Sequence, residues 1–438
     1  MQRNTPKEAH ALQRAIAFGD IPKVSILLEA GYDPNEQGEF YGDALSVAVY
    51  HCHKHPKVVQ ALLEKGASPN SSGGERHGPP LVTAAEAGNL NAVQMLLDAG
   101  ANVDCRGGRY NTALQAVMTA SDHRNKHGII KLLLNYGANA CITSGQFYSA
   151  LSSGFTLLPR DDCIISQLLD YTLSQKHRKD LLDHTIRAAA CLGDLASVQI
   201  LLSAGAGPNA VAEAVESANI DLVCFLVVRG ADINIDEDCY GTGLAIASYD
   251  GLAEIFECLP EHGADVNLVS ERYGTPLQAA AFAGNTELVK RLFDRGADLN
   301  ISYGHWGSPL IAAANAGFKE IIMLLLHSGT DINKKGGEPG TALQAACEMG
   351  DLEAAKLLIS YGAEVNVLAG FTGTPLIAAI RSGNVVLTKL LLDNGANACL
   401  LSSQSNTPLA EALCLQYPEM VKVIQNALTS DASEKSCT

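Results

Sequence analysis

The stretch Tyr273–Asn300, YGTPLQAAAFAGNTELVKRLFDRGADLN, contains one complete structural unit. Thr275 can cap a first helix, and Pro276 takes its first position, where a missing N–H is not needed. Gly284 ends this short, alanine-rich helix. The apolar residues that follow recur at i and i+4 and predict a second, amphipathic helix, which Gly296 closes. We therefore expect a helix, a tight turn, a second helix and a loop that leads to the next cap.

The end of this unit is a Gly-Ala-Asp/Asn-x-Asn pentad that recurs along the chain. Its last six copies follow one another at a constant thirty-three-residue interval, which we call the repeat period. Earlier intervals are less regular, and the one from Gly137 to Gly205 spans two units. The pentads begin at Gly31, Gly66, Gly100, Gly137, Gly205, Gly230, Gly263, Gly296, Gly329, Gly362 and Gly395. Such a period is typical of a stack of small units, each of which contacts only its neighbours.

The pattern resembles the ankyrin repeat over nearly the whole chain. It is carried by the pentads and by helix starts at Thr275-Pro276-Leu277, Ser308-Pro309-Leu310, Thr341-Ala342-Leu343, Thr374-Pro375-Leu376 and Thr407-Pro408-Leu409. The resemblance implies an all-α ankyrin-repeat solenoid of about thirteen helix–turn–helix units with projecting hairpin loops.

One position of the repeat departs from the family's usual pattern. The family usually has His after the helix start, whereas this chain has Gln, Ile or Ala. This difference bears on the hydrogen bonds that the histidine makes between repeats and not on the fold. The variant with Gln, at Gln115, Gln278 and Gln344, resembles arrays that are common in filamentous fungi.

The regularity of the repeats changes along the chain. We expect N-terminal ankyrin repeats over residues 8–140, degenerate and shortened repeats over 141–230, regular C-terminal repeats over 231–428 and a polar tail over 429–438. Cys141–Lys179 lacks regular apolar spacing. The interval from Gly205 to Gly230 is too short to include a full loop between helix pairs.

Composition limits the class of partner. The formal charge is −16, so direct binding to DNA or RNA phosphates is disfavoured, and a protein with a basic or mixed surface fits better. The longest aliphatic runs, Leu222–Val228 and Ile321–Leu326, are far shorter than the ~20 residues that span a bilayer. Without an apolar segment at the N-terminus, we expect an intracellular protein, cytoplasmic or nuclear, that is monomeric alone and does not bind membranes.

Sites for metals, cofactors and catalysis receive little support. The sequence lacks a P-loop, an H-E-x-x-H and a G-x-S-x-G motif, so we expect neither a cofactor nor an enzyme. His51, His53 and His55 invite a metal hypothesis, but their i, i+2 spacing favours a solvated turn. The twelve cysteines include no C-x-x-C pair, and reduced core thiols are the expected state.

A row of aromatic residues provides the candidate binding site. They stand two residues before a helix start, except for Phe371, which is one position further out, and His305 accompanies the only Trp. The candidates are Tyr41, Tyr110, Tyr240, Tyr273, His305, Trp306 and Phe371. They either pack loop against loop or act as exposed anchors for a partner.

These observations favour a non-catalytic protein-binding scaffold or adaptor that uses the concave face and finger loops of an ankyrin array. The alternative is a regulatory subunit or transcriptional coregulator in a fungal biosynthetic gene cluster, which rests on analogy alone. An enzyme without a recognisable motif is the third interpretation.

Overall fold

The computed structural model shows an all-α protein, with 25 helices and no strand among the residues it describes. Contacts divide the chain into two compact units, an N-terminal unit, Met1–Gly207, and a C-terminal unit, Pro208–Thr438. This division falls inside residues 141–230, the range of degenerate and shortened repeats in the sequence. The described residues are 10–37, 42–51, 56–74, 78–108, 111–118, 123–140, 142, 149–151, 162–173, 178–236, 241–401 and 406–435.

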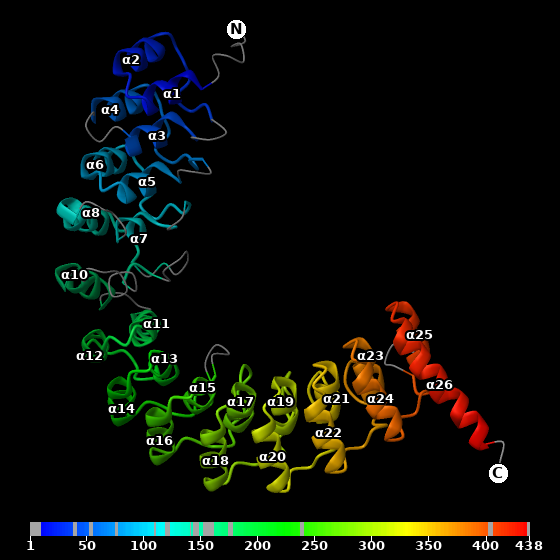
Figure 1. Ribbon diagram of the computed structural model, residues 1–438. Helices are drawn as coiled ribbons and strands as arrows, with labels where there is room; N and C mark the ends of the chain where they lie inside the picture. Colours follow the sequence, from blue (N-terminus) through cyan, green and yellow to red (C-terminus); the bar gives the residue numbers. More distant parts are fainter. Residues whose placement is uncertain are drawn as a thin grey trace. The chain divides into compact units, whose positions relative to one another are not determined.

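The N-terminal unit contains eleven described helices, most of which pair as the first and the second helix of one repeat. They are α1 (Ala11–Ala17), α2 (Ile21–Glu29), α3 (Ala44–His51), α4 (Pro56–Glu64), α5 (Pro80–Glu86), α6 (Leu90–Asp98), α7 (Ala113–Met118), α8 (His123–Asn135), α10 (Asp162–Leu173), α11 (Arg178–Cys191) and α12 (Leu195–Ser203). First helices α1, α3, α5 and α7 form one row, and second helices α2, α4, α6 and α8 form the other (Figure 1).

The C-terminal unit repeats this arrangement with greater regularity. Its helices are α13 (Val211–Glu216), α14 (Ile220–Val228), α15 (Gly243–Asp250), α16 (Ala253–Glu261), α17 (Pro276–Ala283), α18 (Thr286–Asp294), α19 (Pro309–Ala316), α20 (Lys319–His327), α21 (Ala342–Glu348), α22 (Leu352–Ser360), α23 (Pro375–Arg381), α24 (Val385–Asp393), α25 (Pro408–Cys414) and α26 (Pro418–Lys435). First helices α15 to α23 pack in one row and second helices α16 to α24 in another (Figure 1). Helix α26 continues through most of the residues that the sequence marks as a polar tail.

Local signals set the bounds of the helices, as the quoted stretch predicts. The Thr275 side chain accepts a hydrogen bond from the Gln278 N–H, and the Gln278 side chain accepts one from the Thr275 N–H, which makes a capping box at the start of α17. Gly284 ends the helix with a left-handed φ of 83°, a conformation that glycine adopts without strain. Gly296 closes α18 in the same way, with a φ of 78°.

Loops between repeats project as fingers. Segments of constant length separate each second helix from the next first helix in the C-terminal unit, and we call these segments finger loops. Isolated β-bridges fold four of them into hairpins, at Ser270–Gly274, Tyr303–Gly307, Gly336–Gly340 and Ala369–Gly373. By contrast, only residues 204–210 separate α12 from α13, half the usual length.

Asparagines of the pentads tie each repeat to the next. Asn267 Oδ1 accepts a hydrogen bond from the Asp298 N–H at 2.7 Å, and Asn267 Nδ2 donates to the Gly296 carbonyl at 3.3 Å. Asn234 and Asn366 make the same two bonds one repeat earlier and three repeats later. A primary amide offers a donor and an acceptor together, which explains why asparagine recurs at this position.

Glutamine takes over the role of the histidine that the family usually has after the helix start. Gln344 Nε2 donates to the Ala369 carbonyl at 2.7 Å and to the Gly373 carbonyl at 3.1 Å. Gln278 Nε2 donates to the corresponding carbonyls of Tyr303 and Gly307. Each glutamine therefore holds the next finger loop against its own repeat, so the hydrogen bonds between repeats persist.

Candidate functional site

The candidate residues of the sequence differ in their exposure. Tyr41, Tyr110 and Tyr240 lie outside the described residues. Tyr273 is buried, with 7% of its surface exposed, whereas Phe371 is 67% exposed. His305 is exposed and Trp306 is half-buried. Tyr273 thus packs inside its finger loop, whereas Phe371, which stands one position further from its helix start, faces solvent.

An aromatic cluster forms where two finger loops meet the first helices. Trp306 stacks on Phe282 of α17, with ring centroids 4.3 Å apart and planes 10° from parallel. Tyr249 of α15 lies parallel to Trp306 at a centroid distance of 6.2 Å. The Tyr273 ring contacts the Tyr249 ring in a tilted arrangement, with the two ring centroids 5.2 Å apart. We call Tyr249, Tyr273, Phe282 and Trp306 the aromatic cluster.

The repeat period generates this cluster. Tyr249 and Phe282 are one repeat period apart and occupy the last turn of successive first helices, and Tyr273 and Trp306 are one period apart in successive finger loops. Each loop aromatic packs on the aromatic residue of the first helix that precedes its finger loop. The cluster is therefore one contact between repeats that occurs twice in succession.

Tyr273 supports the cluster from the preceding finger loop. An added Cβ at Gly241 would lie 2.6 Å from the Tyr273 ring, so this glycine makes room for the ring. Burial raises the pKa of the Tyr273 hydroxyl, the charges of Asp250 and Glu216 raise it further, and Arg272 opposes them. The Arg272 guanidinium lies over the Tyr273 ring, 5.1 Å from its centroid. A cation therefore already rests on one ring of the cluster.

The tips of successive finger loops, which we call fingertips, are joined to one another by backbone hydrogen bonds. The Glu338 N–H donates to the His305 carbonyl at 3.0 Å, and the Phe371 N–H donates to the Glu338 carbonyl at 2.9 Å. His305 Nδ1 also lies 3.1 Å from Glu338 Oε1. These bonds fix three successive fingertips in line and hold Phe371 at the end of the row.

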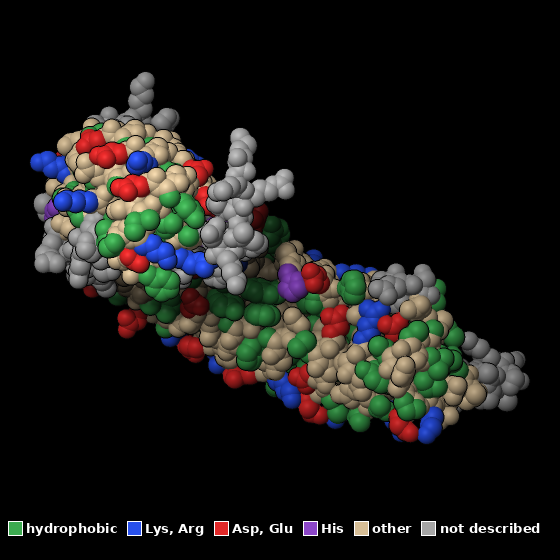
Figure 2. Space-filling view, turned by 90° about the horizontal axis from the view of Figure 1, so that it is seen from above, with side chains coloured by type: hydrophobic (Ala, Val, Ile, Leu, Met, Phe, Trp, Pro, Cys, Tyr) green, Lys and Arg blue, Asp and Glu red, His purple; other side chains and the backbone are tan. Residues whose placement is uncertain are grey.

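A stripe of one residue per repeat runs beside the fingertips along the ends of the first helices. The stripe consists of Glu216, Tyr249, Phe282, Asn315, Glu348 and Arg381. The stripe begins with one acidic and two aromatic residues. It continues with an uncharged polar residue, an acidic residue and a basic residue. Figure 2 views the C-terminal unit from the side of its finger loops, where hydrophobic side chains and acidic side chains are visible together.

The basic end of the stripe is already paired. Arg381 Nε lies 2.6 Å from Glu411 Oε1, and both side chains are largely buried. Arg381 also sits over the Phe371 ring, 5.8 Å from its centroid. Arg381 is therefore neutralised by Glu411, whereas the carboxylates of Asp250 and Glu216, at the ends of the first helices, are exposed.

Sequence reasoning missed the helix side of the cluster. Tyr249 and Phe282 were not candidates, because an aromatic residue at the end of an apolar helix looks like ordinary core. The signal that could have found them is their spacing of one repeat period, since it matches that of Tyr273 and Trp306. This spacing becomes informative only once each finger loop is known to fold back over the first helix of the preceding repeat.

Other candidate sites gain no further support. Cys52–His55 lies outside the described residues. Where the structure describes the chain, no three His, Cys, Asp or Glu side chains are grouped so as to hold a metal ion. In the same part of the chain, no helix combines the length and the apolar content that crossing a bilayer requires.

Family models place the chain among known repeat proteins. The model described as ankyrin repeats (3 copies) matches residues 45–144, 211–303 and 304–369, and the single ankyrin repeat matches residues 373–403. These matches cover more than half of the chain, which therefore belongs to the ankyrin-repeat family. Ankyrin repeats generally bind other proteins, and their fold is typically non-enzymatic.

Curated relatives match parts of the chain. It is 30% identical over 162 residues to an ankyrin repeat-containing protein of Treponema pallidum, covering 36% of this chain and 52% of that protein. It is 34% identical over 92 residues to the palmitoyltransferase Hip14 of Drosophila melanogaster, covering 20% of this chain and 14% of that protein. The chain thus spans about half of the first relative and a small part of the second.

Two human proteins extend the comparison. The chain is 37% identical over 95 residues to cyclin-dependent kinase 4 inhibitor B, covering 22% of this chain and 67% of that protein. The crystal structure of the human ASB11 ankyrin repeat domain is 28% identical, covers 50% of this chain and 96% of that domain, and superposes with a TM-score of 0.43.

Proposed function

We propose that the chain is a non-catalytic adaptor that binds another protein on the first-helix face and finger loops of its C-terminal unit. The observation that supports this most is the stack of Trp306 on Phe282, which leaves Trp306 half-buried and held in place. Aromatic anchors of this kind provide much of the binding energy in protein interfaces.

Rigidity of the face favours binding. Gln278 and Gln344 hold finger loops on their repeats, and the fingertips of His305, Glu338 and Phe371 are hydrogen-bonded in line. A partner therefore meets finger loops whose backbone is already held in place, which reduces the entropy lost on binding. Tyr303, in the same finger loop as Trp306, and Phe371, two finger loops further along the chain, add exposed apolar surface.

The charge of the face favours a partner with a basic or mixed surface. The chain carries a net charge of −16, and carboxylates flank the aromatic cluster. A lysine or arginine of the partner gains from a carboxylate and from an aromatic face at the same place. On this hypothesis the chain is an intracellular protein, monomeric alone, that binds neither nucleic acid nor membranes directly.

The second hypothesis is a regulatory subunit or transcriptional coregulator of a fungal biosynthetic gene cluster. Its support is the resemblance of the repeats that carry Gln115, Gln278 and Gln344 to fungal arrays. The identity of the partner separates it from a general adaptor, because a transcription factor or a biosynthetic enzyme is expected only under the second hypothesis. An enzyme would instead retain a small molecule and no protein partner.

A differential capture experiment tests the proposed face. The full chain and a Trp306→Ala, Phe371→Ala double variant are immobilised, and the proteins they retain are compared by quantitative mass spectrometry. Met323→Ala is the matched control, since it removes an exposed apolar side chain from second helix α20. Circular dichroism first verifies that all three proteins are folded.

The expected result is a partner that the wild type and Met323→Ala retain and the double variant loses. Equal retention by all three proteins would move the binding site away from this face. Retention lost only in Met323→Ala would place it on the row of second helices.

A further inference from the structure

Two cysteines meet across neighbouring second helices of the C-terminal unit. Cys224 lies on α14 and Cys258 on α16, and their Sγ atoms are 3.2 Å apart. Both side chains are half-buried, so small molecules in solution can reach them. Two sulfurs of a disulfide are about 2.05 Å apart, and a movement of roughly 1 Å would bring this pair to bonding distance.

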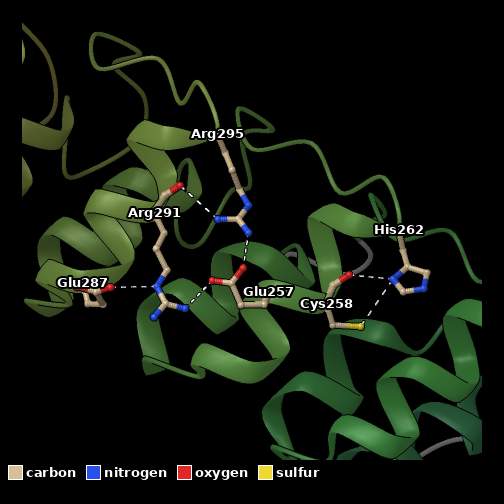
Figure 3. A network of polar contacts seen from close by, with 6 residues as sticks. All are labelled: Glu257, Cys258, His262, Glu287, Arg291 and Arg295. Atoms are coloured by element: carbon tan, nitrogen blue, oxygen red, sulfur yellow. Dashed lines mark hydrogen bonds and ion pairs between the residues drawn. The ribbon is translucent and has the colours of Figure 1, made fainter.

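The register of the repeats explains why these side chains face each other. Glu257 and Arg291 lie one repeat period after Cys224 and Cys258 and occupy the same helix positions in α16 and α18. They also meet, because Arg291 forms an ion pair with Glu257, which Arg295 joins from the end of α18 (Figure 3). The same two positions thus connect consecutive repeats by an ion pair at one interface and bring two thiols together at the other.

The surroundings of Cys258 distinguish it from a thiol that merely fills space. His262 Nδ1 lies 3.7 Å from Cys258 Sγ and 2.8 Å from its carbonyl oxygen (Figure 3). Cys347, by contrast, is fully enclosed, and burial raises its pKa far above the ordinary value. A reagent in solution can therefore approach Cys258 but not Cys347.

We propose that Cys224 and Cys258 are a modification site, at which a small-molecule disulfide oxidises them to a reversible disulfide between two consecutive repeats. One thiolate of the pair attacks a sulfur of the small disulfide, whose S–S bond breaks and releases one small thiol. The second thiolate attacks the protein sulfur of the mixed disulfide, forms the Cys224–Cys258 bond and releases the second small thiol. Two protein thiols are oxidised, one small disulfide is reduced, and their two protons leave with the small thiols.

The rate of this exchange follows the thiolate fraction. Burial raises the pKa of Cys258 to about 11, and Cys224 and Glu261 add to the shift. Cys258 is therefore mostly protonated at neutral pH, where exchange is slow.

The disulfide would fasten the first repeat of the C-terminal unit to the second. Helices α13 and α14 follow the short segment 204–210 instead of a full finger loop. In a stack that is stabilised only by contacts between neighbours, a repeat near the end of a unit opens first. A covalent link from α14 to α16 would restrain that opening.

Peptide mass spectrometry tests the proposal on the full chain. The reduced protein is incubated with glutathione disulfide, free thiols are alkylated, and tryptic peptides are compared with those of Cys224→Ser, Cys258→Ser and a control, Cys414→Ser. We expect a cross-linked peptide pair that joins Cys224 to Cys258 and is two hydrogens lighter than the two thiols. The cross-link should persist in Cys414→Ser, vanish in the other two variants and disappear with dithiothreitol.

A second measurement detects the mechanical effect. Arg229 is exposed at the end of α14, and cleavage after it by trypsin requires α14 to open. Oxidation should slow this cleavage by about threefold or more in the wild type and not in Cys224→Ser. Three results would overturn the proposal. The first is glutathione adducts on the separate cysteines, and the second is that Cys224 and Cys258 stay free when the exposed Cys399 is already modified. The third is a rate of cleavage after Arg229 that oxidation leaves unchanged.

Discussion

The indole ring of Trp306 lies nearly parallel to the phenyl ring of Phe282, with centroids 4.3 Å apart, although the two residues belong to different repeats. Trp306 reaches back from its finger loop to the first helix of the preceding repeat. The stack is therefore a contact between repeats and a part of the exposed face at once. The Trp306 side chain therefore fits both alternatives that the sequence raises, loop packing and partner binding.

Removal of Trp306 should affect both stability and binding. Trp306→Ala deletes the stack on Phe282 and exposes it, and we expect a loss of about 1–3 kcal/mol in the free energy of unfolding. Affinity for the captured partner should fall at least about tenfold after correction for the folded fraction. Urea denaturation and a titration with the partner measure the two effects.

Phe371→Ala serves as the comparison, because that ring is 67% exposed and contributes little to packing. We expect a change in unfolding free energy within about 0.5 kcal/mol, together with weaker binding. If Trp306→Ala left the urea midpoint unchanged, the stack would contribute nothing to stability.

Gln344 should be essential for holding its finger loop. Its Nε2 group donates to two carbonyls, and Gln344→Glu replaces these donors with an acceptor of nearly the same shape. The carbonyls of Ala369 and Gly373 then face a carboxylate, and we expect a loss of about 2 kcal/mol or more at neutral pH. Thr341→Val is the matched control, since it removes the cap of the same helix and the hydrogen bond from Thr341 Oγ1 to Gln344 Oε1 but leaves both donor bonds of Gln344 Nε2 intact. Denaturant unfolding of Gln344→Glu that coincides with the wild type would contradict this role.

The helices could be predicted from the sequence because each signal acts within a few residues. Thr275 caps the helix that it begins, and the left-handed glycines end helices where the pattern places them. The repeat period then reproduces the same local solution along the chain. Asparagine ladders follow from the same period, although the sequence did not reveal their bonds.

The exposure of the finger aromatics could not be predicted because it depends on the preceding repeat. Tyr273 is buried where Tyr249 lies beside it and Gly241 leaves room for its ring. Phe371 has Arg381 near its ring and remains largely exposed. The two residues also differ by one position in the repeat, since buried Thr372 takes the place equivalent to Tyr273, so both the register and the neighbour across the interface set their environment.

The ion pair between Arg381 and Glu411 should be sensitive to the loss of one partner. Burial alone raises the pKa of Glu411, but hydrogen bonds from Arg381 and Asn406 more than offset this and lower it. Arg381→Met leaves a buried carboxylate without its cation, and we expect a loss of about 3 kcal/mol at pH 7.

A second substitution in the same pair provides the control. Arg381→Met combined with Glu411→Met removes both charges, so the double variant should recover most of the lost stability in thermal unfolding. If the double variant were less stable than Arg381→Met alone, the defect would come from lost packing and not from the unpaired carboxylate.

Glu257 should make the C-terminal unit sensitive to acid. Burial alone raises the pKa of its carboxyl, but hydrogen bonds from Arg291 and Arg295 more than offset this and hold the pKa below 4.5. A carboxyl with a lowered folded pKa stabilises the protein above its ordinary pKa, and this contribution disappears as the pH falls through the folded value. Urea midpoints of the wild type and Glu257→Gln should therefore differ at pH 7 and converge as the pH falls below 4.5.

Glu287→Gln is the control, because Glu287 is exposed, pairs with Arg291 alone and should barely change the midpoint at pH 7. A difference between the wild type and Glu257→Gln that stayed constant from neutral to acid pH would show that the charge of Glu257 does not stabilise the interface between α16 and α18.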